Sequence, residues 1–130
     1  FASVDVEESV RSLRSLLRLC FAQQPSADEL YLMLGYCVSV SPYVRRSMLS
    51  RLIDNDDLLP KIRKPVVLVQ GTEDAVVRPA AADQHKAGIA HAQIQMMAKV
   101  GHAAFWEDAA TFNRNLRRFV SAARGGAAAG

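Results

Sequence analysis

The sequence is poor in the residues that build disulfide frameworks and metal sites. Its 130 residues include two cysteines, Cys20 and Cys37, and three histidines. The cysteines lie in apolar surroundings, with neither C-x-x-C spacing nor a His-rich segment near them, so we expect neither a disulfide scaffold nor a zinc site. We instead expect buried thiols in a reducing, cytoplasmic compartment, with no bound metal and no cofactor.

Long apolar runs and a strong charge imbalance are also lacking. No segment approaches the roughly 18 apolar residues of a membrane-spanning helix, and the first residues, FASVDVEE, do not resemble a signal peptide. The net charge is only +3, and the Lys and Arg residues are spread along predicted helices rather than gathered with aromatic residues. We therefore expect a globular domain that binds neither membranes nor nucleic acid. Its start at Phe1 is typical of a fragment or a processed chain.

Helix signals dominate residues 1–60. Asp5 with Glu8 and Ser26 with Glu29 have the spacing of capping boxes, and Ser41-Pro42 predicts the start of a third helix. Apolar residues recur at helical spacing after each start. We expect the following to face inward: Val6, Val10, Leu13, Leu17 and Cys20, then Leu30, Met33 and Leu34, then Val44, Met48, Leu49 and Leu52.

The pattern changes to strand, helix, strand, helix after Pro65. The apolar run 66–69 predicts a strand inside a parallel sheet, and the alternating run 92–97 predicts a second, half-covered strand. Helices are predicted from Pro79 to about Gly88 and from about Asp108, with a loop over 99–106. This order predicts an α/β fold. The last helix should bury Phe112, Leu116, Phe119 and Val120, whereas 125–130, which contains only Gly and Ala, should be disordered or an added tail.

The two predicted strands lead into loops with a carboxylate and an imidazole. Gly71-Thr72-Glu73-Asp74 follows the first strand, and Gly101-His102 follows the second. Because parallel strands end at the same edge of a sheet, Asp74 and His102 should emerge side by side. A carboxylate beside a histidine fixes the tautomer of the imidazole and stabilises its protonated form. The pair is therefore a candidate for the acid and the base of a nucleophilic triad.

These segments resemble a known superfamily. PVVLVQGTEDAVVRP and AQIQMMAKVGHAAFWEDAATFNRNLRRF are similar to the last two core strands of α/β-hydrolases, where G-x-x-D supplies the triad acid and a G-H pair supplies the base. The resemblance assigns these roles to Asp74 and His102. It also implies a helical cap over 1–60, the C-terminal part of the hydrolase core over 61–124, and a small ester-like substrate.

Other residues near these motifs have weaker signals. The resemblance makes Tyr36, Tyr43, Met48, Val76 and Trp106 candidates for the substrate pocket, with Met33 and Leu34 beside them. Phe105 and Trp106 are as well explained by packing against the last helix. Glu73, His85 and His91 are expected at the surface. Cys37, in Gly35-Tyr36-Cys37-Val38-Ser39, lacks the second glycine of a nucleophile elbow.

The nucleophile itself is missing from the sequence, because no serine has the G-x-S-x-G context. Two parallel strands cannot form a stable sheet alone. We therefore expect the partner to be either an N-terminal part of the same enzyme or a second copy of the chain. Two alternatives stay open: a catalytically inactive fragment with a binding or assembly role, and an enzyme with an Asp nucleophile, as in dehalogenases and epoxide hydrolases.

Overall fold

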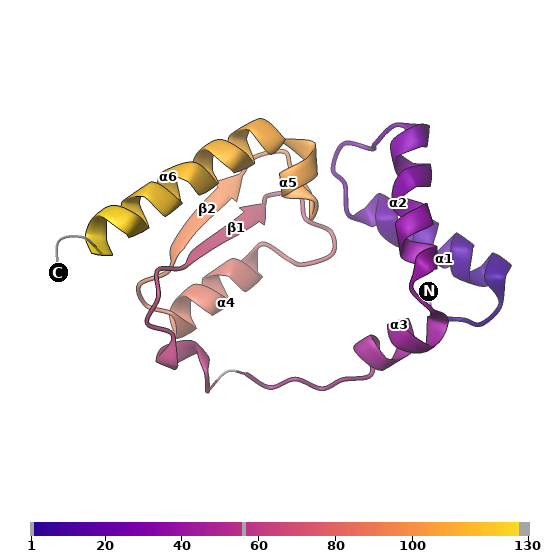
Figure 1. The fold of residues 1–130 in the computed structure, drawn as a ribbon, viewed down its shortest axis with the longest axis horizontal. Coiled ribbons are helices and arrows are strands. Elements are labelled where there is room, and N and C mark those ends of the chain that lie inside the picture. The colour runs from indigo at the N-terminus through magenta and orange to yellow at the C-terminus, as the bar shows by residue number, and fades with distance from the viewer. Residues whose placement is uncertain (1, 56, 128–130) are drawn as a thin grey trace.

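The computed structural model describes residues 2–55 and 57–127, which form two lobes (Figure 1). The helical lobe contains α1 (Val6–Leu19), α2 (Ala27–Ser39) and α3 (Pro42–Leu49). The α/β lobe contains β1 (Val67–Gly71), α4 (Ala80–Gly88), β2 (Gln93–Met97), α5 (Ala104–Glu107) and α6 (Ala109–Ala127). A segment with a 3-10 turn, η1 (Leu59–Lys61), leads from one lobe into the other.

Local hydrogen bonds start the first two helices. The Asp5 carboxylate accepts the Glu8 N–H at 2.7 Å, but the Glu8 carboxylate accepts from the Ser3 hydroxyl rather than from the Asp5 N–H. The Ser26 hydroxyl accepts the Glu29 N–H, and the Glu29 carboxylate accepts the Ser26 N–H in return. The capping box predicted at Ser26 is therefore confirmed, whereas the one predicted at Asp5 is only half formed.

The inward apolar face predicted for the third helix is wrong in the described chain. Ser41 caps α3 and Pro42 stands in its first turn, as predicted. Leu52, however, is fully exposed, and so are large parts of Val44, Met48 and Leu49. In α1 the prediction is right for Leu13, which is buried, and wrong for Val6, which is exposed. The spacing of these residues is helical, but few side chains of the described chain cover them.

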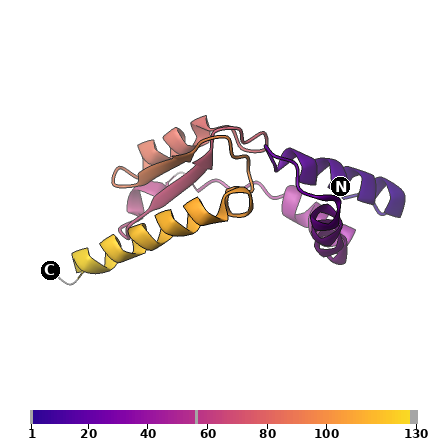
Figure 2. The same cartoon turned by 90° about the horizontal axis from the view of Figure 1, so that it is seen from above.

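The two strands pair in parallel, in a register that runs from Val67 opposite Gln93 to Gly71 opposite Met97. Helix α4 lies on one face of this sheet and α6 on the other (Figure 2). The parallel strands with their helices confirm the predicted α/β class. Because Gly71 and Met97 are paired, the loops that follow β1 and β2 leave the sheet at the same edge.

The hydrophobic core of the α/β lobe is formed where the end of β2, the loop after it and the start of α5 meet. Met97, Val100 and Ala104 form its buried cluster, and Val69 and Phe112 pack against them. Of the residues predicted to be buried in the last helix, Phe112 and Phe119 are half-buried, but Leu116 and Val120 are exposed. The core therefore fixes the start of α6 more firmly than its later turns.

Three further details differ from the sequence predictions. In β2 the alternation fails, because Met96 is exposed while the Oε1 atom of Gln95 is buried without a hydrogen bond among the described residues. The expected loop over 99–106 contains the start of α5, and α6 continues to Ala127, past the start of the expected tail. Residues 128–130 of that tail lie outside the described residues.

None of the helices in the described ranges has both the length and the apolar character needed to cross a bilayer.

Candidate active site

Backbone hydrogen bonds hold the loop after β1 against the loop after β2. The Thr72 N–H donates to the Met97 carbonyl at 2.9 Å, and the Glu73 N–H donates to the Val100 carbonyl at 3.0 Å. The Lys99 N–H returns a bond to the Thr72 hydroxyl at 2.9 Å. Lys99 adopts a φ of 60°, in the left-handed region that non-glycine residues seldom occupy. The two loops are therefore one connected unit rather than two independent turns.

Gly71 permits this close approach. A Cβ atom at this position would stand 2.2 Å from both the Val100 and the Gly101 carbonyl oxygens. These are backbone atoms, which cannot swing aside as a flexible side chain could. Glycine at the end of β1 is thus a direct requirement of the packing between the two loops.

At the edge of the sheet where β1 and β2 end, the Asp74 carboxylate accepts several hydrogen bonds. Its side chain is only 5% exposed. Oδ1 accepts the N–H groups of Val76 and Val77, each at 2.8 Å, and Oδ2 lies 2.9 Å from Nδ1 of His102. The structure therefore brings together the two residues that the sequence singled out as acid and base.

Gln70 is a member of this network that the sequence analysis missed. It is buried, and its Nε2 donates to Asp74 Oδ2 at 3.1 Å and to the carbonyls of Gly71 and Val77, both at 3.2 Å. The available signal was a polar residue in an otherwise apolar strand. Gln70 ties the carboxylate to the backbone on both sides of its loop.

These contacts determine the charge on Asp74. Burial by itself raises the pKa of the carboxyl, but the hydrogen bonds from Val77, His102 and Val76, together with the positive charge of a protonated His102, lower it, and the net pKa lies below the ordinary 3.8. Hydrogen bonds to the ionised form outweigh desolvation here. Asp74 is therefore an anion at neutral pH, as a residue that orients a histidine must be.

His102 is more open than its partner, with its side chain 42% exposed. A carboxylate can only accept, so the Nδ1 atom facing Asp74 carries the proton when the ring is neutral. Nε2 is then unprotonated and has no hydrogen bond to any residue in the described ranges. This arrangement leaves a basic nitrogen free to take a proton from an incoming hydroxyl group.

The pocket candidates from the sequence are divided between the two lobes. The Val76 N–H bonds Asp74, and Trp106, in α5, donates from Nε1 to the Glu29 carboxylate at 3.4 Å. Tyr36 and Tyr43 are exposed on α2 and α3. Met48 is exposed too, beside an apolar groove of about 270 Å³ whose lining includes neither Asp74 nor His102. Of these five candidates, only Val76 is hydrogen-bonded to the Asp74–His102 pair within the described residues.

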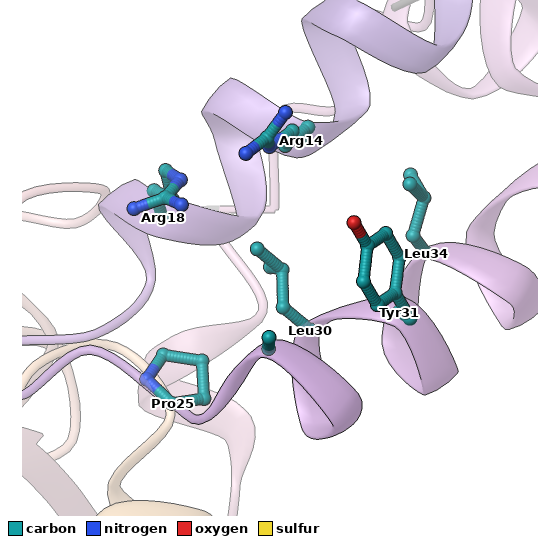
Figure 3. A pocket seen from close by; sticks show the side chains of 7 residues that line it. Arg14, Arg18, Pro25, Leu30, Tyr31 and Leu34 are labelled. Atoms are coloured by element: carbon teal, nitrogen blue, oxygen red, sulfur yellow. The ribbon is translucent and has the colours of Figure 1, made fainter.

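A second hollow lies between α1 and α2, lined by Arg14, Arg18, Leu30, Tyr31 and Leu34 among others, with a volume of about 130 Å³. Figure 3 shows the two arginines on one helix and the remaining labelled side chains on or before the other. Neither Asp74 nor His102 lines it. Leu34, one of the pocket candidates, thus borders a cavity of the helical lobe and not the strand-end site.

Cys20, whose backbone carbonyl bonds the residue after His102, does not have the properties of a nucleophilic thiol. Burial raises the pKa of Cys20, and the negative charges of Asp74 and of Cys37 raise it further. A thiol with a raised pKa is protonated and unreactive at neutral pH. Within the part of the chain that the structure describes, no three His, Cys, Asp or Glu residues are grouped so that they could hold a metal ion.

Comparison with known proteins gives matches among solved structures. A candidate aryl esterase from Burkholderia cenocepacia is 30% identical to the chain with a TM-score of 0.89, over 95% of the chain and 46% of the esterase. An esterase from a Rhodococcus species is 27% identical with a TM-score of 0.86, over 94% of the chain and 45% of that protein. An esterase from Exiguobacterium antarcticum, 21% identical, shares the fold with a TM-score of 0.75, over 88% of the chain and 45% of its own.

The chain thus spans just under half the length of the first two esterases, and it is related to them in sequence as well as in fold. No protein-family model and no curated protein matches the sequence.

Proposed function

We propose that this chain, which has the fold of the C-terminal part of an α/β-hydrolase, supplies the acid and the base of an ester hydrolase. The observation that carries the proposal is the 2.9 Å contact between the buried Asp74 carboxylate and Nδ1 of His102 at the ends of two paired strands. The similarity to two esterases supports the same reaction class. The substrate would be a small carboxylic ester.

In this mechanism His102 moves protons and Asp74 keeps it in place. Nε2 of His102 removes the proton of a nucleophilic hydroxyl as its oxygen attacks the ester carbonyl carbon. The protonated ring then gives this proton to the leaving alcohol as the ester C–O bond breaks. In the second half, His102 activates a water molecule that hydrolyses the acyl-enzyme. Asp74 stays ionised throughout and stabilises the imidazolium.

The nucleophile and the oxyanion hole would come from polypeptide outside these 130 residues. No serine of the sequence has the two flanking glycines of a nucleophile elbow, and Cys20 has a raised pKa. The exposed apolar side chains of α3 are consistent with a missing neighbour. We propose that the remaining part of the same enzyme, or a second copy of the chain, covers them.

The test is ester hydrolysis by the complete protein that contains this chain, with His102→Ala compared with His85→Ala. His85 is an exposed histidine of α4 whose ring bonds the Ala81 carbonyl, so its loss should leave turnover unchanged. Loss of His102 should lower kcat by at least about 10³-fold, because the base acts only in the transition state. Equal turnover by the two variants would refute the proposed function.

A further inference from the structure

Glu107, the last residue of α5, joins the loop of His102 to the turn between α1 and α2. Its Oε1 accepts the Gly101 N–H at 2.7 Å. Its Oε2 accepts the N–H groups of Ala22 and Gln23, each at 2.9 Å. One carboxylate therefore holds the residue just before His102 and two residues about 80 positions earlier in the chain.

The residue after His102 is held from the same turn. The Ala103 N–H donates to the Cys20 carbonyl at 2.9 Å. A Cβ atom on Gly101 would stand 2.7 Å from the Ala22 nitrogen and 2.9 Å from the Cys20 oxygen. Both neighbours of His102 are thus fixed against residues 20–23, one directly and one through Glu107.

The imidazole has few other restraints. Its side chain is 42% exposed, and its hydrogen bond within the described residues is the one to Asp74. In a given rotamer the ring moves with its own backbone, so a shift of the loop would displace the imidazole. The position of His102 Nε2 consequently depends on the backbone at Gly101 and Ala103.

We propose that Glu107 is a positioning residue for His102: it holds the loop of the base against the α1–α2 turn without touching the substrate. This inference rests on the proposed function, because it assigns Glu107 a part in setting the base of that reaction. It also makes the helical lobe part of the structure that holds the base, although that lobe contributes no acid, base or nucleophile to the mechanism.

The direct variant is Glu107→Gln in the complete protein. Glutamine has the same shape but a single oxygen, so its NH₂ group must face at least one of the three N–H donors. The loop should lose part of its anchor and His102 should shift. Misplacement of a reacting group by about 1 Å can cost on the order of 100-fold, and we expect kcat to fall by about 10- to 100-fold, with KM changed by less than about twofold.

The matched control is Glu7→Gln, the same chemical change at an exposed residue of α1 that pairs with Arg11. It should leave kcat as it is. A second readout is the downfield proton resonance of His102 Nδ1–H, which should shift or broaden in Glu107→Gln and stay unchanged in Glu7→Gln. Unchanged resonance and kcat in Glu107→Gln would overturn the inference.

Failure of the proposed function and failure of the positioning role of Glu107 would give different results. If wild-type protein shows no ester hydrolysis that depends on His102, the proposed function fails, while the resonance still tests the positioning role. If Glu107→Gln does not fold, the hydrogen bonds to Glu107 can be tested by amide hydrogen exchange of the wild-type protein. The amides of Ala22, Gln23 and Gly101 should be protected together, and rapid exchange at all three would overturn the inference.

Discussion

The strand-end loops and the helical lobe differ in how completely their side chains are hydrogen-bonded or covered within this chain. In the loops, the buried Asp74 carboxylate bonds Gln70, Val76, Val77 and His102. In the helical lobe, side chains cap the starts of the helices, but Leu52 is fully exposed and many other apolar side chains are partly exposed. Within the described residues, the buried Asp74 carboxylate is fully hydrogen-bonded, whereas much of the apolar surface of α1–α3 is exposed.

The two regions should respond differently to substitution. A buried ion with every lone pair engaged is expensive to assemble and strongly destabilised if one partner is removed. An exposed apolar helix face becomes stabilising only when another surface covers it. The strand-end loops should therefore be sensitive to small changes, and the exposed apolar faces of α1–α3 tolerant of them.

The largest effect on stability is expected for Gly71→Ala. The added methyl group would stand 2.2 Å from two backbone oxygens, so the two loops must separate. We expect a loss of about 3 kcal/mol or more in the free energy of unfolding, measured by urea denaturation of the complete protein. A loss below about 0.5 kcal/mol, the range of ordinary surface changes, would show that the loops are not packed as described.

A second effect is the pH dependence that Asp74 gives to stability. Its pKa in the folded state lies below the ordinary 3.8, so between these two values the unfolded chain binds more protons than the folded one. The contribution of Asp74 is complete above the ordinary pKa and is lost as the pH falls through the lower, folded value. In Asp74→Asn, the free energy of unfolding should fall less over this acid range.

The control for this comparison is Asp83→Asn, at an exposed carboxyl of α4. Its acid profile should follow that of the wild-type protein. If Asp74→Asn and wild type lose stability in parallel as the pH falls below the ordinary pKa, the hydrogen bonds to Asp74 do not hold its charge.

The smallest effect is expected for Gly35→Ala, in the middle of α2. A Cβ atom there would meet nothing within 4 Å, and alanine is the better helix former. The variant should be more stable by about 0.5–1 kcal/mol, in the opposite direction to Gly71→Ala. A clear loss of stability instead would mean that another surface packs closely on this face of α2 in the complete protein.

The sequence predicted what depends on local chemistry. Ser26 and Glu29 define a helix start with their own atoms, and the apolar run before Gly71 defines a strand whose end places Asp74. The position of His102 beside it followed from the geometry of parallel strands, and the resemblance to α/β-hydrolases pointed to the same pair. Their juxtaposition was therefore predictable, whereas their catalytic role stays a prediction.

What could not be predicted depends on residues that are distant in the sequence. Gln70 appeared as an odd polar residue in a strand, and its role is visible only once its amide lies between Asp74 and the backbone. Glu107 contacts Ala22 and Gln23, which no local pattern indicates. The inward faces predicted for α3 failed because helical spacing says which residues share a face, but not whether anything covers it.

In the proposed mechanism, His102 activates a nucleophile supplied from outside these 130 residues. A fluorophosphonate probe on the complete protein tests it most directly, with the labelled residue located by mass spectrometry. We expect one labelled serine outside this chain, with labelling slowed by at least about 10³-fold in His102→Ala and unchanged in His85→Ala. Labelling of a residue within the chain, or labelling at the same rate without His102, would contradict it.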